Sequence, residues 1–220
     1  MLGGMSEAAG DGWLSALAGR FLVFDGPDGS GKTTQFRRLA RAAAGAGLDV
    51  LEVREPGGTP VGEQIRQLLL DPDQAMTPKC EMLLYMASRA QLVDQRIAPA
   101  REAGKLVMAD RFISSTLAYQ GTAGGLDPDH IRQVGRIALG DHWPELTIIF
   151  DVDQATAAGR LSPLLDRMEQ KGAAYHQRVR QGFLDQAAAD PDRHLVIDAA
   201  ADAETVYQRL THALANRLTS

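Results

Sequence analysis

The sequence predicts an α/β fold in which helices cover both faces of a five-stranded parallel sheet. Short apolar runs with the length of buried strands alternate with longer stretches of helical character. Each apolar run is followed by a polar or glycine-rich segment. Strict alternation is typical of a parallel sheet, because a crossover helix must carry the chain back to the start of each new strand.

The five predicted strands span residues 21–25, 50–53, 106–109, 146–151 and 195–198. Helices are expected over residues 33–46, 60–70, 78–103, 114–119, 128–139 and 202–218, and a long polar stretch runs from 154 to 189. Thr59 and Thr77 each precede a proline. This pair is a helix N-terminal signal, because the hydroxyl caps a free backbone N–H and proline fits the first helical position.

Length and composition limit the classes of protein to which the chain can belong. The 220 residues and the formal net charge of −5 are expected of a single domain and argue against a protein that coats nucleic acid. The single cysteine, Cys80, cannot form an intrachain disulfide, which is typical of the reducing cytoplasm. Apolar stretches stay below the ~18 residues of a membrane span. We therefore expect a cytoplasmic domain over residues 20–220, a flexible extension over residues 1–19, and no nucleic-acid or membrane partner.

The first strand leads into a segment that matches the phosphate-binding pattern G-x-x-x-x-G-K-[ST]. Its members are Gly26, Pro27, Asp28, Gly29, Ser30, Gly31, Lys32, Thr33 and Thr34. The glycines let backbone N–H groups point at phosphate oxygens, and the helix that follows favours an anion at its N-terminus. Lys32 is expected to reach the β- and γ-phosphates of ATP, and Thr33 to hold Mg²⁺. A chance glycine-rich turn is the alternative, but the flanking strand and helix favour the loop of a P-loop NTPase, which binds a nucleoside triphosphate.

Charged residues also follow the other four predicted strands. Arg54 follows the second, Asp110 and Arg111 the third, Asp151 the fourth and Asp198 the fifth. Because the carboxyl ends of parallel strands meet at one edge of the sheet, we expect all of them around a single cleft. Asp110 has the position of a magnesium-linked carboxylate and Arg111 that of a phosphate clamp. A turn-capping aspartate and a surface ion pair are the respective alternatives.

The predicted helix 78–103 offers a possible base-binding pair. Tyr85 and Arg89 are four residues apart and share one helix face. Tyr85 could stack on a ring while Arg89 reaches a carbonyl or a phosphate. The alternative is a core tyrosine beside a solvated arginine.

Residues 154–172 have the character of a mobile lid. The segment is polar, and Pro163 interrupts any continuous helix. A closing lid here could bring Arg160 and Arg167 over the transferred phosphoryl group. A solvated helix with charge pairs is the alternative.

Six motifs occur in order along the chain. They are FDGPDGSGKTT at 24–34, REPGGT at 54–59, SRAQL at 88–92, DRF at 110–112, AYQG at 118–121 and DRME at 166–169. Together they resemble the bacterial thymidylate kinases, and the resemblance runs from about residue 20 to the C-terminus. It departs from the family at Tyr85, where phenylalanine is usual, and at Gly29 and Ser30, where some members carry a basic residue.

The resemblance implies how a dTMP acceptor is bound. Tyr85 would stack on thymine, Arg89 would contact a thymine carbonyl or the monophosphate, and Thr116 would hydrogen-bond the base edge. Asp28 would contact the deoxyribose 3′-hydroxyl. Tyr119 would crowd the sugar 2′ position and so exclude ribonucleotides.

For the phosphates and the metal ion, the resemblance implies a second group of residues. Arg111 would bind the monophosphate, and Thr33 and Asp110 would hold Mg²⁺. Arg54 and the acidic lid residue Glu169 are expected to complete the substrate site, and Asp166 matches a second acidic lid position. The expected catalytic cations are Lys32, Arg111, Arg160 and Arg167.

The implied reaction is ATP + dTMP → ADP + dTDP, a direct in-line transfer that requires Mg²⁺ and serves dTTP biosynthesis. The acceptor phosphate has a second pKa of about 6 and is already ionised at neutral pH, so that no general base is needed. The resemblance also implies a homodimer. The alternatives are a kinase of another nucleotide or deoxynucleoside, a P-loop NTPase switch, and an inactive kinase-like binding module.

Overall fold

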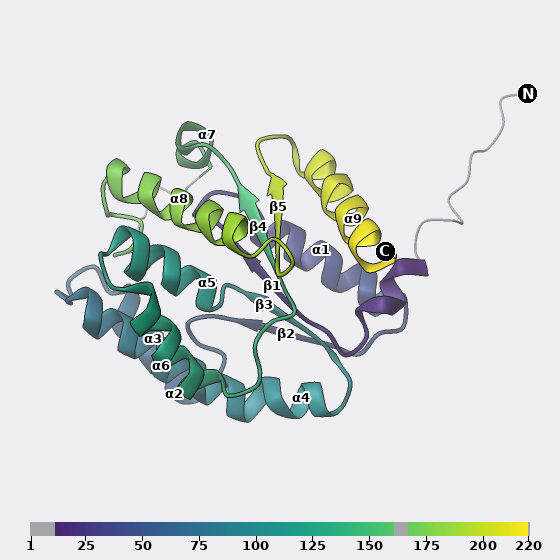
Figure 1. Cartoon of the computed structure of the whole chain (residues 1–220), viewed down its shortest axis with the longest axis horizontal. Coiled ribbons are helices and arrows are strands. Elements are labelled where there is room, and N and C mark those ends of the chain that lie inside the picture. Colours follow the sequence, from purple (N-terminus) through teal and green to yellow (C-terminus); the bar gives the residue numbers. More distant parts are fainter. Residues whose placement is uncertain (1–11, 161–166, 220) are drawn as a thin grey trace, which may run out of the picture.

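The computed structural model describes residues 12–160 and 167–219 and contains the predicted five-stranded parallel sheet (Figure 1). The strand order is β2-β3-β1-β4-β5. The strands are β1 (Phe21–Asp25), β2 (Val50–Arg54), β3 (Leu106–Asp110), β4 (Leu146–Asp151) and β5 (His194–Asp198). The fold class predicted from the alternation of apolar runs and helices is confirmed. Since β1 is central, the loop that follows it lies between the loops of its two neighbours.

The helices connect and cover the strands. They are η1 (Gly12–Leu17), α1 (Lys32–Gly45), α2 (Pro60–Leu70), α3 (Pro78–Leu92), η2 (Val93–Ile97), α4 (Ala98–Glu102), α5 (Ile113–Thr116), η3 (Leu117–Ala123), α6 (Pro128–Leu139), α7 (Gln154–Ala158), α8 (Ala173–Ala189) and α9 (Ala203–Thr219). Here η1 is a 3₁₀ helix, and η2 and η3 are π-helical turns.

Two hydrophobic layers sandwich the sheet. On one face, side chains of alternate β1 residues such as Leu22 and Phe24 pack against η1, α1 and α9. On the other face, Phe21 and Val23 pack against α3, η2 and α6. A smaller cluster joins α8 to η3 and β4. This alternation follows from strand geometry, because successive side chains point to opposite faces of the sheet.

The capping signals read from the sequence are confirmed. The Thr59 hydroxyl accepts a hydrogen bond from Gly62 N at 3.0 Å, and the Thr77 hydroxyl accepts one from Cys80 N at 3.3 Å. The helix predicted over residues 78–103 differs in its second half, where η2 separates α3 from α4. Pro99 has no N–H to donate four residues back, so the regular α-helical ladder is interrupted at this point.

The described part of the N-terminal extension belongs to the folded domain. Trp13, Leu14 and Leu17 of η1 are buried in the same core cluster as Leu210 and Leu214 of α9. The expected domain boundary at residue 20 is therefore wrong for residues 12–19. These residues contain too few apolar side chains to be recognised as a helix in the sequence. Burial of those side chains against α9 nevertheless fixes the position of η1. Residues 1–11 lie outside the described part.

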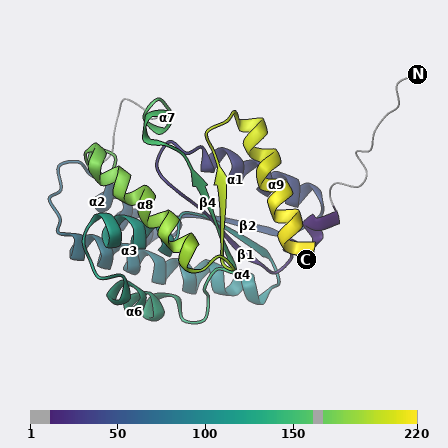
Figure 2. The same cartoon turned by 45° about the horizontal axis from the view of Figure 1, so that its top comes forward.

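The lid segment begins at the carboxyl end of β4, where α7 lies beyond the arrowhead of the strand (Figure 2). Residues 161–166 of the predicted lid lie outside the described residues, and Pro163 and Asp166 are among them. Among the helices that are described, there is no segment long and apolar enough to cross a membrane.

Candidate active site

A cavity of about 270 Å³ opens at the carboxyl ends of β1, β2 and β3. Its lining includes every residue predicted to bind the acceptor, namely Asp28, Arg54, Tyr85, Arg89, Arg111, Thr116, Tyr119 and Glu169. Lys32, Thr33 and Asp110 of the predicted triphosphate and metal sites line it as well. The fold thus brings residues from six separate segments of the chain to one place.

The phosphate loop between β1 and α1 contributes Asp28, Lys32 and Thr33 to the lining of this cavity. A Cβ on Gly26, whose φ is 135°, would lie 2.5 Å from the Phe150 carbonyl oxygen, so that only glycine allows the loop to approach β4 this closely. Lys32 is buried, and its Nζ donates to the Pro27 carbonyl at 3.4 Å. Burial and the neighbouring Arg111 lower the pKa of Lys32, against the opposing effect of Asp28. A cation in this setting gains a great deal from an anionic ligand.

Thr33 and Asp110 meet at the mouth of the loop. The Thr33 hydroxyl donates to Asp110 Oδ2 at 2.7 Å. The parallel register of β1 and β3 pairs Phe24 with Asp110, which places this carboxylate beside the loop that follows β1. A hydroxyl and a carboxylate oxygen are ligands that Mg²⁺ prefers, and the ion usually takes its remaining ligands from substrate phosphates and water.

Asp28, Arg111 and Tyr119 form a second group of interacting side chains in the cavity lining. Arg111 NH2 makes a short ion pair with Asp28, and the Tyr119 hydroxyl donates to Asp28 Oδ2 at 2.7 Å. Burial alone would raise the pKa of Asp28, but Arg111 and Lys32 outweigh it and hold this pKa below its usual range. Asp28 is therefore charged at neutral pH.

Arg111 adopts a left-handed backbone conformation with a φ of 69°, which is unfavourable for a residue with a side chain. Its N–H donates to the Phe24 carbonyl at 2.9 Å, and its NH1 donates to the Gly26 carbonyl at 3.1 Å and to Ser115 Oγ at 2.9 Å. The guanidinium is thus fixed over the phosphate loop, as expected of a phosphate clamp.

Asp25 lies beneath Arg111 and was not predicted as a site residue. It is fully buried, and it accepts hydrogen bonds from the Ser115 N–H at 2.9 Å and from Ser115 Oγ at 2.6 Å. Burial raises its pKa in spite of the nearby Arg111 guanidinium, 3.4 Å away. A charged residue at the end of an otherwise apolar strand was the signal that could have identified it.

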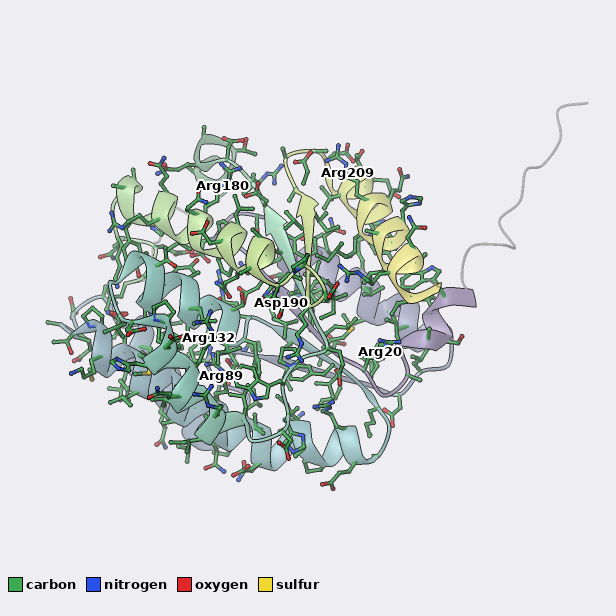
Figure 3. All side chains as sticks on the ribbon, in the orientation of Figure 1. Arg20, Arg89, Arg132, Arg180, Asp190 and Arg209 are labelled. Atoms are coloured by element: carbon green, nitrogen blue, oxygen red, sulfur yellow. The ribbon has the colours of Figure 1, made fainter. Side chains whose placement is uncertain are left out.

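Arg89, labelled in Figure 3, is 1% exposed and lines the cavity. Its Nε donates to Glu55 Oε2 at 2.7 Å, and its NH2 donates to Thr116 Oγ1 at 3.2 Å. Burial raises the pKa of Glu55 to about 7, although Arg89 acts against this shift. The structure therefore rules out a solvated Arg89. The structure also adds Glu55 to the residues of the cavity lining, whereas the sequence indicated it only as a member of the REPGGT motif.

The rim of the cavity is partly exposed. Arg54 NH2 donates to both carboxylate oxygens of Glu63, to Oε1 at 3.0 Å and to Oε2 at 2.9 Å. Arg66, another residue that the sequence did not single out, donates to the Pro56 carbonyl at 3.0 Å and lines the cavity. Tyr85 lines the same rim from α3, so it is a cavity residue and not part of the apolar core.

Neither predicted lid arginine reaches the cavity lining. Arg160 donates to the carbonyl oxygens of Ala199, Ala200 and Ala201, at 2.9, 2.9 and 3.2 Å. Arg167 is 9% exposed, and its Nε donates to the Leu69 carbonyl at 2.8 Å. In this structure both guanidinium groups are bonded to backbone carbonyl groups, and neither residue lines the cavity.

The expectation that all five strand ends share one cleft is wrong for β4 and β5. Asp151, at the end of β4, makes a bidentate ion pair with Arg180 of α8 at 2.6 and 2.7 Å. Asp198, at the end of β5, is ion-paired with Arg209 of α9 at 2.7 Å. Figure 3 labels both arginines, which lie on the helices that flank these strands. These charges serve packing between strand ends and helices, and three strand ends are enough for the cavity.

The strand, the glycine-rich loop with its lysine, and the hydroxyl–carboxylate pair beside it define a P-loop nucleotide-binding protein with an adjoining acceptor cavity. A family model described as thymidylate kinase matches residues 24–210. The chain belongs to the thymidylate kinase family.

Individual relatives agree with this assignment. The chain is 44% identical over 203 residues to a thymidylate kinase of Deinococcus radiodurans, covering 90% of this chain and 98% of the relative. It is 46% identical over 189 residues to one of Thermomicrobium roseum, covering 84% and 90% of the two chains. The crystal structure of a thymidylate kinase from Ehrlichia chaffeensis superposes with a TM-score of 0.72 at 34% identity, covering 89% of this chain and 98% of that one.

Proposed function

We propose that this protein transfers the γ-phosphoryl group of ATP to dTMP, giving ADP and dTDP, a step toward dTTP. The observation that carries the proposal is the cavity beside the phosphate loop, lined by all eight predicted acceptor residues. A simple NTPase switch has no need of such a cavity. The family membership supports the same reaction.

The donor set at Thr33 and Asp110 fits a magnesium ion. The two oxygens are 2.7 Å apart and lie beside Lys32 in the cavity lining. Among the described residues there is no cluster of three or more potential protein ligands, which fits an ion that binds through one carboxylate and substrate phosphates. Mg²⁺ bound there supplies positive charge to the β- and γ-phosphates.

The chain's own task is to bring two highly negative groups together. Lys32 provides positive charge at the triphosphate, and Arg111 provides it at the acceptor monophosphate. Asp25 and Ser115 fix the Arg111 side chain, so little reorganisation is needed when charge develops on the transferred group. The buried setting strengthens each of these interactions and limits the access of water to ATP.

On the acceptor side, each contact matches one part of dTMP. Arg89 NH2 lies 3.2 Å from Thr116 Oγ1, and both side chains offer hydrogen-bond donors to the edge of thymine. Tyr85 offers a ring for stacking, while Asp28 and Tyr119 bracket the sugar. The Tyr119 ring would reject a 2′-hydroxyl by crowding.

A direct contribution of Arg160 to transfer stays a prediction. Its three carbonyl partners on residues 199–201 would have to be exchanged for phosphate oxygens. Replacing an arginine that stabilises the transferred group costs about 10³-fold or more in rate. If Arg160→Ala turns over at the wild-type rate in a coupled assay, this role is wrong.

We also propose that the protein is a cytoplasmic homodimer. Leu83 on α3 and Ile137 on α6 are large apolar residues that are 50% and 87% exposed, and the two helices pack side by side. A second copy would cover them. Light scattering should give twice the monomer mass for the wild type and the monomer mass for Ile137→Glu; a monomeric wild type would contradict the proposal.

The acceptor panel tests the reaction itself. With ATP and Mg²⁺, dTMP should be phosphorylated with a kcat/KM at least about tenfold above that of dUMP, dCMP, AMP or thymidine, because only dTMP uses every contact. Efficient phosphorylation of another acceptor would support the alternative kinase. ATP hydrolysis without any phosphorylated acceptor would support an NTPase switch.

A further inference from the structure

One buried carboxylate near the cavity has no part in the reaction described so far. Glu81, in the first turn of α3, is 1% exposed. Lys171 Nζ lies 3.1 Å from its Oε1, and Arg167 NH2 lies 3.1 Å from its Oε2. One carboxylate therefore holds two cations, both from the segment between α7 and α8.

The two cations are the ends of a short turn, residues 167–171. Between them, Met168 and Glu169 line the acceptor cavity. Arg167 makes two further contacts with the end of α2, where its Nε donates to the Leu69 carbonyl at 2.8 Å and its backbone N–H to the Leu70 carbonyl at 3.4 Å. The turn is thus attached at both of its ends to the α2–α3 region, with its cavity-lining residues in the middle.

The same turn contacts the sugar side of the cavity. Met168 is buried in one cluster with Tyr119, whose hydroxyl donates to Asp28. Lys171 lies 4.7 Å from the centre of the Tyr175 ring, and the Tyr175 hydroxyl donates to the Tyr119 carbonyl at 2.7 Å. A displacement of the turn would therefore also shift Tyr119, which forms part of the cavity wall.

We propose that Glu81 is a positioning residue for the acceptor cavity, which keeps Met168 and Glu169 in the cavity wall by holding Arg167 and Lys171. A buried ion pair contributes little net stability compared with an apolar contact of the same volume, so a geometrical role accounts better for a carboxylate here. The identity of the acceptor as dTMP rests on the function proposed above. Glu81 itself touches no reacting atom.

The test compares Glu81→Gln, Lys171→Gln and the double variant with the wild type. We expect each single variant to raise KM for dTMP about tenfold while KM for ATP changes less than about twofold, because Met168 of the turn packs against Tyr119 of the proposed acceptor site. The double variant should resemble Glu81→Gln alone, since the two residues act through one contact. The dissociation constants for dTMP, measured by calorimetric titration, should rank the variants in the same order as the KM values. Asp49→Asn is the matched control. It breaks an exposed ion pair, in which Lys105 Nζ lies 2.9 Å from Asp49 Oδ2, and neither residue lines the cavity.

Several outcomes overturn the proposal. One is a Glu81→Gln protein that melts at a lower temperature but keeps the wild-type KM for dTMP, because the carboxylate would then be merely structural. Another is an equal rise in both KM values. If Glu81→Gln does not fold, Lys171→Gln decides alone, because Lys171 is 28% exposed and its loss leaves the buried carboxylate paired with Arg167. Wild-type protein that neither binds nor phosphorylates dTMP would instead refute the proposed function.

Discussion

At the scale of single residues, the cavity is built from charges that largely neutralise one another. Arg111 is shared between Asp28 and Asp25, and Arg89 is paired with Glu55. The strand-end pattern indicated Arg111, and the four-residue spacing of Tyr85 and Arg89 on one helix face indicated Arg89. The sequence also identified Asp28, but not Asp25 or Glu55 as partners of these arginines, because a buried partner is selected by three-dimensional proximity and leaves no periodic pattern in the sequence.

The raised pKa of Glu55 makes stability depend on pH. Its pKa is about 7 in the folded protein against the ordinary value of 4.5, so between these pH values the folded state retains a proton that the unfolded chain has released. The stability contributed by this residue is therefore greatest below pH 4.5 and decreases as the pH rises to about 7. Relative to Glu55→Gln, the wild type should lose at most about 3 kcal/mol of unfolding free energy over this interval.

Urea denaturation at several pH values between about 4.5 and 8 measures this difference. The exposed Glu52→Gln, on the same strand, controls for the loss of a carboxylate. A difference between wild type and Glu55→Gln that does not vary with pH would show that Glu55 keeps an ordinary pKa in the folded protein.

At the scale of elements, prediction was best where one local signal sets the structure. The five strands, the phosphate loop and the threonine caps depend on apolar runs, glycines and prolines that can be read within a few residues. The interruption of the long helix at η2 also has a local cause, Pro99. Its position along the chain was seen only in the structure. The positions of Arg160 and Arg167 depend on carbonyl groups about 40 and about 100 residues away in sequence, which no local pattern encodes.

The phosphate loop also packs against α7, and a substitution at Gly29 tests this contact. A Cβ there would collide with the Ala157 carbonyl oxygen, and the φ of 76° is unfavourable for alanine. We expect Gly29→Ala to raise KM for ATP about tenfold or more, equivalent to about 1.4 kcal/mol. Steady-state kinetics at varied ATP measures the effect.

Gly45→Ala is the control for this substitution. Gly45 lies at the end of α1, and a Cβ added there meets no atom within 4 Å. This variant should keep its KM for ATP and be stabilised by about 0.4–1 kcal/mol. Equal kinetic effects of Gly29→Ala and Gly45→Ala would mean that the loop does not depend on its contact with α7.

At the scale of the whole molecule, η1 and α9 complete the core on one face of the sheet. Leu17 is fully buried, so Leu17→Ala should reduce the unfolding free energy by about 2–5 kcal/mol through lost burial and a cavity. The kinetic constants for ATP and dTMP should stay unchanged, since η1 does not line the cavity. Leu68→Ala, at a residue that is 48% exposed, should change stability by about 0.5 kcal/mol or less in the same urea titration.

A Leu17→Ala protein that is as stable as the wild type would contradict the packing of residues 12–17 in the core. It would instead support the flexible extension that the sequence predicted. The sequence could not decide this point, because three apolar side chains become informative only when their partners on α9 are known.

The packing of η1 against α9 has a consequence for how the protein is made. Trp13, Leu14 and Leu17 are translated early, but their partners Leu210 and Leu214 leave the ribosome about 190–200 residues later. During synthesis this apolar surface has no permanent cover. A chaperone that binds nascent chains should therefore find a site there until the last helix has been released.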